Sequence, residues 1–230
     1  MDKKNYQMCT KGLWDTAIPG ITFDKNGVSN YCKMLQEMEK AYPKGEKGKN
    51  NWEKILNEVR NKGKNNKYDC IIGVSGGTDS SYMLHLAKKE WNLKPLAVNL
   101  DNGWSTDIAV SNIKKVTEAL DIDLETYVID YEEVKAVLRS YIKANLPWID
   151  GPTDLAIKAI LYKTAIKENI KYIFIGDDFR SEGKQPHHWT YSDAKQLKFI
   201  CKKFENLSLK SFPYMTLIKF FYYNIMKGVK

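Results

Sequence analysis

One segment of the chain carries the residue types that bind phosphate. The loop Ser75–Ser80, with the sequence SGGTDS, follows an apolar run at 70–74 and precedes apolar residues at helical spacing. Two adjacent glycines let the backbone approach an anion, because no Cβ is in the way. The unpaired N–H groups at the start of the helix then point at that anion, and hydroxyls add further donors. The predicted phosphate-binding residues are Ser75, Gly76, Gly77, Thr78, Asp79 and Ser80.

Asp79 is the only carboxylate in this loop, and its charge repels phosphate unless a cation lies between them. Mg²⁺ suits that position because it binds carboxylate and phosphate oxygens together. The sequence therefore predicts a phosphorylated ligand bound with magnesium, with Asp79 as a ligand of the metal.

The loop matches neither of two common phosphate-binding patterns. No lysine follows the glycines, as GxxxxGK[ST] requires, and the pattern GxGxxG is missing. The residues resemble the SGGxDS loop of the PP-loop ATP pyrophosphatases. That resemblance implies that the loop binds the β- and γ-phosphates of ATP and that the reaction releases pyrophosphate. The alternative is a glycine turn that only joins a strand to a helix.

Strands and helices are expected to alternate along the chain after this loop. Helices between successive strands imply a parallel sheet with right-handed crossovers. The predicted fold class is therefore α/β, with helices on both faces of a parallel sheet. The apolar patterns predict strands at 70–74, 96–100, 124–129 and 172–175, and helices at 108–120, 132–144 and 153–168.

Further polar residues follow the predicted strands, where ligands of such sheets bind. Asp101 comes after the second strand and can meet a ribose or an adenine edge, and Gly176 comes after the fourth. Asp177 is predicted to share the magnesium ion with Asp79, and these two are the predicted catalytic residues. A helix N-cap is an equally good interpretation of Asp177 and Asp178.

Four residues are candidates for substrate contact, each with a structural alternative. Trp104 begins a loop and can stack on a ring or simply pack. Asp154 is expected to cap a helix, as is Thr153, and a substrate-facing role can coexist with capping. Glu182 lies in a loop that could cover the site, and His188 lies in a polar loop placed near the substrate.

The N-terminal segment resembles a pair of metal knuckles that have each lost a ligand. A four-cysteine zinc site needs two CxxC pairs, and here Cys9 and Cys32 face Gly12 and Ser29 at the partner positions. Two thiolates do not close a tetrahedral site, so no zinc is expected. The pair Asn26-Gly27 predicts a tight hairpin between these ends.

Composition fits a globular chain of 230 residues with 43% hydrophobic residues and a net charge of +8. The predicted domains are a knuckle-like module with a helix at 1–66 and an ATP-binding domain at 67–230. Basic charge suits an anionic partner, or equally a solvated surface. No signal peptide or membrane span is expected, and four scattered cysteines indicate a reducing cytoplasm.

The C-terminal stretch is dense in aromatic and aliphatic residues. Apolar residues lie on nearly all sides of a helix predicted at 212–226. Such a helix is either buried or docked on a partner. Because it runs almost to Lys230, we expect a chain that is cut short relative to its family or that has a partner subunit.

Beyond the loop, the chain resembles the N-acetyl sugar amidotransferases, PP-loop enzymes of bacterial lipopolysaccharide and related surface-sugar synthesis. The resemblance implies an adenine nucleotide alpha-hydrolase-like fold, with ATP and Mg²⁺ as cofactors. It implies transfer of ammonia to the acetamido group of a nucleotide-linked N-acetyl sugar, with AMP and pyrophosphate released. It also implies separate glutaminase and ammonia-channel subunits. The stretches that carry it are Cys9–Cys32, Asp69–Tyr82, Leu96–Trp104, Ala109–Ile113, Pro152–Asp154, Ser181–Gly183 and Phe212–Gly228.

Two other functions remain open. A PP-loop enzyme that modifies tRNA would suit the basic charge, but thiolation needs a cysteine at a strand end. Cys70 lies inside the first predicted strand and Cys201 lies on a helix, so a nucleic-acid partner is not expected. The other alternative is a truncated, non-catalytic nucleotide-binding subunit. The missing cysteines, the short C-terminus and the aspartates after Gly176 all depart from the family pattern.

Overall fold

The computed structural model describes residues 6–182 and 186–230, except the side chains of residues 181, 182, 187 and 188. Contacts divide the chain into two compact units. One comprises residues 1–54 and 177–191, and the other comprises residues 55–176 and 192–230. The division into domains at 1–66 and 67–230 stays a prediction. No described helix is both long and apolar enough to span a membrane.

The larger unit is built on one four-stranded sheet. The order is β3-β2-β1-β4, and all three neighbouring pairs are parallel. The predicted α/β fold with a parallel sheet is confirmed. The strands are β1 (Cys70–Gly73), β2 (Pro95–Asp101), β3 (Leu124–Val128) and β4 (Ile173–Phe174).

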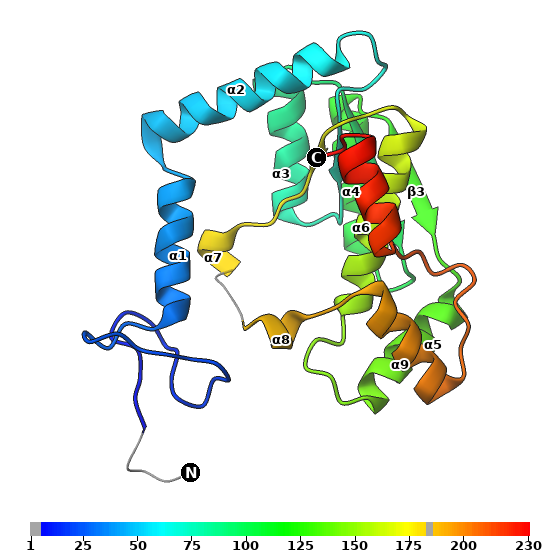
Figure 1. Cartoon of the computed structure of the whole chain (residues 1–230). Coiled ribbons are helices and arrows are strands. Elements are labelled where there is room, and N and C mark those ends of the chain that lie inside the picture. The colour runs from blue at the N-terminus through cyan, green and yellow to red at the C-terminus, as the bar shows by residue number, and fades with distance from the viewer. Residues whose placement is uncertain (1–5, 183–185) are drawn as a thin grey trace. The chain divides into compact units, whose positions relative to one another are not determined.

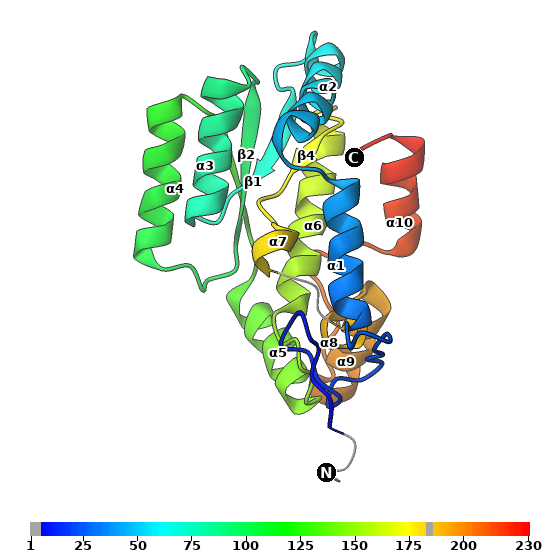
Figure 2. The same cartoon turned by 90° about the vertical axis from the view of Figure 1, so that its left-hand side faces the viewer.

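Helices cover both faces of the sheet (Figures 1 and 2). On one face lie α3 (Thr78–His85), which continues as the π-helix η2 (Leu86–Glu90), and α4 (Asp107–Leu120). On the other face lies α6 (Gly151–Lys167), whose N-cap is Asp150. Its buried Ile160, Leu161 and Ala165 pack on Ile71, Leu96 and Val98 of the sheet. Burial of these side chains is what holds α6 in place.

A second core joins α5 (Tyr131–Lys143) to α9 (Ala194–Glu205). Val137 and Tyr141 of α5 pack with Leu197 of α9, and all three are almost fully buried. The buried Glu133 carboxylate ties the segment after α9 to this core. It accepts hydrogen bonds from the backbone N–H groups of Lys210 (2.5 Å), Ser211 (2.8 Å) and Phe212 (3.2 Å), and one from the Ser211 hydroxyl.

The helix predicted at 212–226 is wrong at its N-terminal end. It begins only at Leu217, as α10 (Leu217–Phe221), and continues as the π-helix η3 (Tyr222–Met226). Thr216 caps it, while Phe212 is buried in the second core. The side chains of Leu217 and Ile218 are about four-fifths exposed, and Phe220 packs against Tyr162 of α6. No residue of α10 or η3 is buried, so the buried alternative is wrong, and docking on a partner stays a prediction.

The smaller unit contains α1 (Asn30–Ala41), α7 (Phe179–Glu182), α8 (His187–Thr190) and the N-terminal part of α2 (Gly45–Gly63). Before α1 the chain forms two turns, each closed by a single antiparallel bridge, Met8 to Asp15 and Phe23 to Ser29. The predicted hairpin at Asn26-Gly27 is thus one bridge and a turn rather than two paired strands. Gly27 has φ +72°, which favours glycine at that turn.

The Glu133→Ala substitution tests the second core. It removes the acceptor for three backbone N–H groups, so we expect the free energy of unfolding to fall by about 3 kcal/mol. Urea denaturation of the full chain measures this change. Glu132→Ala is the matched control, because that neighbouring side chain is 75% exposed and forms only a surface ion pair with Lys135. Equal effects of the two substitutions would contradict the role given to Glu133.

Candidate functional site

The loop between β1 and α3 is shaped by its close approach to α4. Gly76 has φ +79°, and a Cβ at this position would lie 2.2 Å from the carbonyl oxygen of Ala109. Asn112, one turn further along α4, donates from Nδ2 to the carbonyl oxygen of Gly76 at 3.2 Å. Only glycine fits here, because any side chain would displace the loop or the helix. Sequence analysis assigned no role to Ala109 or Asn112.

Two hydroxyl groups fix the loop from the inside. The Ser75 N–H donates to Ser80 Oγ at 3.3 Å, and the two Oγ atoms are 3.4 Å apart. The Gly77 N–H donates to Ser75 Oγ, and Ser80 Oγ donates to the Gly77 carbonyl. Ser80 is buried and Ser75 is exposed. Both hydroxyls are thus engaged within the loop, and direct ligand contact by either stays a prediction.

The start of α3, like that of α6, has no side-chain capping bond. Its N-cap is Gly77, which has no side chain and therefore makes no side-chain capping bond. By contrast, Thr106, Asp130 and Asp193 cap α4, α5 and α9 through their side chains. The first N–H groups of α3 are consequently left for solvent or a ligand. An anion at this point would meet both these donors and the positive end of the helix dipole.

Asp79 lies in the first turn of α3, and its side chain is exposed. Among the described residues neither Asp79 nor its neighbour Thr78 has a side-chain hydrogen bond or ion pair. Gly176, just after β4, lies beside it, since a Cβ on Gly176 would be 3.5 Å from the Asp79 Cβ and 3.6 Å from the Ser80 nitrogen. The structure therefore brings Gly176 against the phosphate loop, as predicted from the ends of the strands.

Asp101 ends β2 at the same edge of the sheet. Its Oδ1 accepts the N–H of Gly103 at 2.9 Å, and Asn102 accepts the N–H of Trp104 in the same way. These turns set the conformation of the loop, so one carboxylate oxygen of Asp101 has a structural role. The Trp104 ring is 56% exposed and packs against Tyr131, with the ring centroids 5.8 Å apart. Both of the alternatives for Trp104, packing and stacking on a ligand, are compatible with this position.

Asp154 is not the helix N-cap that was predicted. The N-cap of α6 is Asp150, and Pro152 follows it in the first turn. Asp154 lies inside the helix, where its Oδ2 accepts a hydrogen bond from Trp148 Nε1 at 3.2 Å. This bond explains the carboxylate structurally, and a contact of Asp154 with substrate stays a prediction.

The remaining predicted site residues belong to the smaller unit. Asp177 follows Gly176 directly and is exposed, and Asp178 accepts the N–H of Arg180 at 3.0 Å, as an N-cap does. The second magnesium ligand, Asp177, stays a prediction. Glu182 lies in α7 and His188 in α8, and their side chains are outside the described part of the structure.

The donor set suits magnesium better than a metal that needs an all-protein cage. The described residues contain no group of three or more His, Cys, Asp or Glu side chains placed to hold one ion. Mg²⁺ is commonly bound by one or two carboxylates, phosphate oxygens and water. Asp79 at the mouth of the loop supplies one such carboxylate, so the residues present fit the predicted ion.

A cavity of about 880 Å³ lies elsewhere in the larger unit. It is lined mainly by apolar side chains of α6 and of residues 215–220, including Leu161, Tyr162 and Leu217. Lys158 and Lys195 also line it. None of the predicted site residues lines this cavity, so it is separate from the phosphate loop.

The Gly76→Ala substitution tests the contact between loop and helix. Alanine there combines a positive φ with a clash against Ala109, so we expect about 3 kcal/mol of lost stability. Gly228→Ala is the control in the same unit, because Gly228 also has a positive φ (+64°) but has no atom within 4 Å of its Cβ position. The control should cost only about 1 kcal/mol. Urea denaturation compares them, and equal losses would rule out the close approach.

Comparison with known proteins gives one match to a family model, one curated relative and several distant structural likenesses. An uncharacterized protein of Methanocaldococcus jannaschii is 37% identical over 103 residues, which are 45% of this chain and 36% of that protein. The chain therefore matches about a third of that relative's length. Solved structures give weaker likenesses. They include an NH3-dependent NAD synthetase from Campylobacter jejuni (19% identity, TM-score 0.41, 56% of each chain).

Two further structures are an NMN synthetase from Francisella tularensis and a U34-tRNA thiolase from Methanococcus maripaludis. The first is 14% identical with a TM-score of 0.42, over 76% of this chain and 93% of that one. The second is 18% identical with a TM-score of 0.37, over 77% and 64%. The model of the NAD synthase family matches residues 50–194, which include the phosphate loop, Asp101 and Gly176. Because that match covers more than half of the residues of this chain, the chain belongs to the NAD synthase family.

Proposed function

We propose that this protein is an ATP-dependent amidotransferase that releases AMP and pyrophosphate. The observation that supports this most directly is the start of α3, where Gly77 leaves the helix N–H groups uncapped. A pyrophosphate group is an anion of the kind that such donors bind. Membership of the NAD synthase family, over a segment that includes this loop, supports the same class of ATP chemistry.

Each part of the loop has a role in this proposal. The backbone N–H groups at 78–80 hold the β- and γ-phosphates, and they stabilise the charge that gathers on pyrophosphate as it departs. Asp79 binds the magnesium ion, and its exposed position in the first turn leaves it open to do so. When bound, magnesium neutralises the phosphate oxygens and makes pyrophosphate a better leaving group. Gly176 adds no side chain beside Asp79, which leaves room for the nucleotide.

The proposed substrate is the acetamido group of a nucleotide-linked N-acetyl sugar, on the basis of the sequence resemblance. An amide oxygen is a poor leaving group, so it first attacks the α-phosphorus of ATP and pyrophosphate departs. Ammonia then adds to the activated carbon, AMP leaves with the oxygen, and an acetamidino group remains. We propose that separate glutaminase and ammonia-channel subunits supply the ammonia.

Two buried thiols argue against the alternative of tRNA thiolation. Cys70 lies in β1 and Cys201 in α9, and neither side chain is exposed. Burial raises the pKa of Cys70, and it raises the pKa of Cys201 to about 11. A thiolate that carries sulfur must be accessible and ionised. Neither cysteine of the larger unit, which carries the phosphate loop, meets these conditions, and this favours amidation over thiolation.

The Asp79→Asn substitution tests the metal ligand. It removes one charge without changing the side-chain size, so we expect magnesium-dependent ATP affinity to fall at least tenfold while the melting temperature stays the same. Isothermal titration with ATP, with and without Mg²⁺, measures this. Asp107→Asn is the control, because Asp107 is an exposed first-turn aspartate of α4, a helix that Thr106 already caps. Unchanged ATP affinity in the Asp79 variant would remove the proposed role.

A turnover assay tests the function itself. The chain is supplied with ATP, Mg²⁺, ammonium and candidate UDP- or CMP-linked acetamido sugars, and the nucleotide products are measured. We expect AMP and pyrophosphate in equal amounts, dependent on both sugar and ammonium. ADP as the product would overturn the proposed mechanism. Formation of NAD from its precursors would keep the mechanism but replace the sugar, and ATP binding without turnover would favour the non-catalytic alternative.

A further inference from the structure

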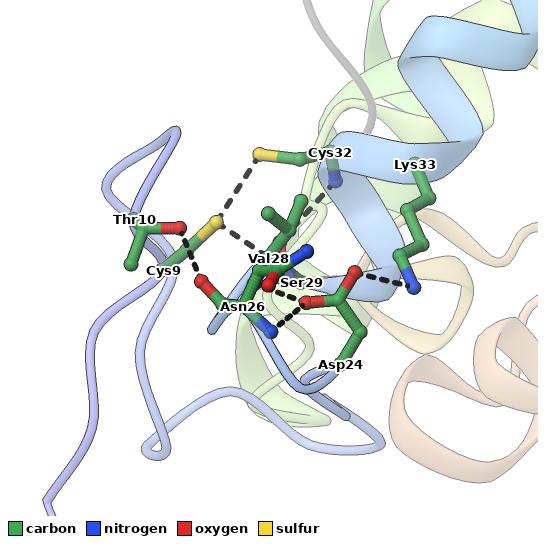
Figure 3. Close-up of polar contacts among 8 residues, drawn as sticks. All are labelled: Cys9, Thr10, Asp24, Asn26, Val28, Ser29, Cys32 and Lys33. Carbon is green, nitrogen blue, oxygen red and sulfur yellow. Dashed lines mark hydrogen bonds and ion pairs between the residues drawn. The ribbon is translucent and has the colours of Figure 1, made fainter.

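Two cysteines of the smaller unit lie next to each other although they are 23 residues apart. The Sγ atoms of Cys9 and Cys32 are 3.5 Å apart (Figure 3). Cys9 lies in the turn that the Met8–Asp15 bridge closes, and it is buried. Cys32 lies in the first helical turn of α1 and is half-buried. The other two cysteines, Cys70 and Cys201, lie in the other unit and have no cysteine partner.

The sulfur of Cys9 is surrounded by hydrogen-bond donors. The N–H groups of Lys11 and Ser29 donate to it at 3.4 and 3.2 Å. Burial raises the pKa of Cys9, but the hydrogen bonds with Ser29, Lys11 and Cys32 outweigh it and lower the pKa to about 7. Burial raises the pKa of Cys32, and its contact with Cys9 acts in the same direction. Cys9 is therefore the member of the pair that ionises first as the pH rises.

The Asp24 carboxylate stabilises the turn that precedes Ser29. Asp24 accepts the N–H groups of Asn26 and Val28 at 2.8 and 3.0 Å, and it forms an ion pair with Lys33 at 2.9 Å (Figure 3). The hydrogen bond with Lys33 and then that with the N–H of Val28 lower the pKa of Asp24 to about 2. These bonds fix the 24–28 turn at neutral pH, and with it the donor to Cys9.

Around this pair there is space beside Cys32 and no further metal ligand among the described residues, so each sulfur has the other as its reaction partner. A Cβ on Gly12 would lie 2.9 Å from Cys32 Sγ, so a larger residue would crowd that sulfur. The Ser29 hydroxyl accepts the N–H of Cys32 and caps α1. No third metal-ligating side chain joins Cys9 and Cys32 within the described residues, whereas a structural zinc site needs four.

We propose that Cys9 and Cys32 form a dithiol site that small-molecule disulfides oxidise reversibly to an intramolecular disulfide. The juxtaposition of the two sulfurs supports this most directly, because the second step is then intramolecular. The disulfide links the first turn of the chain to the start of α1 and closes a loop of about 24 residues, a length for which such bonds typically stabilise.

The chemistry is thiol–disulfide exchange in two steps. The thiol of Cys32, which is the more accessible, loses its proton to solvent, and its sulfur attacks one sulfur of the oxidant. The oxidant's S–S bond breaks, and its first thiolate leaves. The Cys9 thiolate then attacks Cys32 Sγ, the mixed disulfide breaks, and the second small thiolate leaves. Two protein thiols lose two electrons, which the oxidant gains as it becomes two thiols.

The test uses the full chain, reduced and then incubated with oxidised glutathione. Free thiols are alkylated under denaturing conditions, and the products are mapped by mass spectrometry. We expect a Cys9–Cys32 linked peptide and full alkylation of Cys70 and Cys201. The Cys9→Ser variant should instead accumulate a glutathione adduct on Cys32, because the resolving thiolate is missing. The Cys201→Ser variant should form the disulfide at the wild-type rate, as the matched control.

The pH dependence adds a readout that a merely structural pair would not give. The resolving step requires the Cys9 thiolate, so its rate should rise with pH and reach half its maximum near pH 7. A free thiol would reach that point near pH 8.5. A stable glutathione adduct on the wild-type chain, disulfides between chains, or a metal that blocks alkylation of both thiols would each overturn the proposal.

Discussion

The candidate site depends on the close approach of Gly76 to α4. The loop can turn towards the start of α3 only because Gly76 adopts a positive φ and has no side chain against Ala109. Asn112 then holds the loop by its carbonyl oxygen. Gly176 lies on the other side of the loop, beside Asp79, where a Cβ would make ordinary van der Waals contacts. The conformation of the loop before α3 is thus set by its contact with α4 at Gly76 and Asn112.

The parallel sheet and the strand–glycine turn–helix unit around SGGTDS could be predicted from the sequence because both are local signals. Continuous apolar runs marked β1 and β2, and SGGTDS followed directly after a strand. The contact between Gly76 and Ala109 could not be predicted, since it joins residues 33 positions apart across two elements. The same holds for Glu133, whose partners at 210–212 lie far along the chain.

The predictions that failed concern where helices begin and which residues cap them. The C-terminal helix was expected from residue 212 because aromatic residues are dense there, but Pro213 and the capping Thr216 delay its start. Asp154 was expected to cap α6, yet Asp150 precedes the helix and Trp148 engages Asp154. Helix α1 was not expected, because Ser29 was considered as a lost zinc ligand rather than as the N-cap that it is. Capping signals compete, and tertiary packing decides between them.

The uncapped start of α3 has an energetic consequence for the free protein. A glycine N-cap forgoes only a few tenths of a kcal/mol relative to a serine or an aspartate. A bound phosphate supplies the missing acceptor, so any ligand that prefers the folded chain shifts the unfolding equilibrium in proportion to its own concentration. If ATP binds as proposed, the melting temperature of this unit rises with the ATP concentration. A serine in place of Gly77 would cap α3 and stabilise it. Its hydroxyl would then compete with an anion for the same backbone N–H groups.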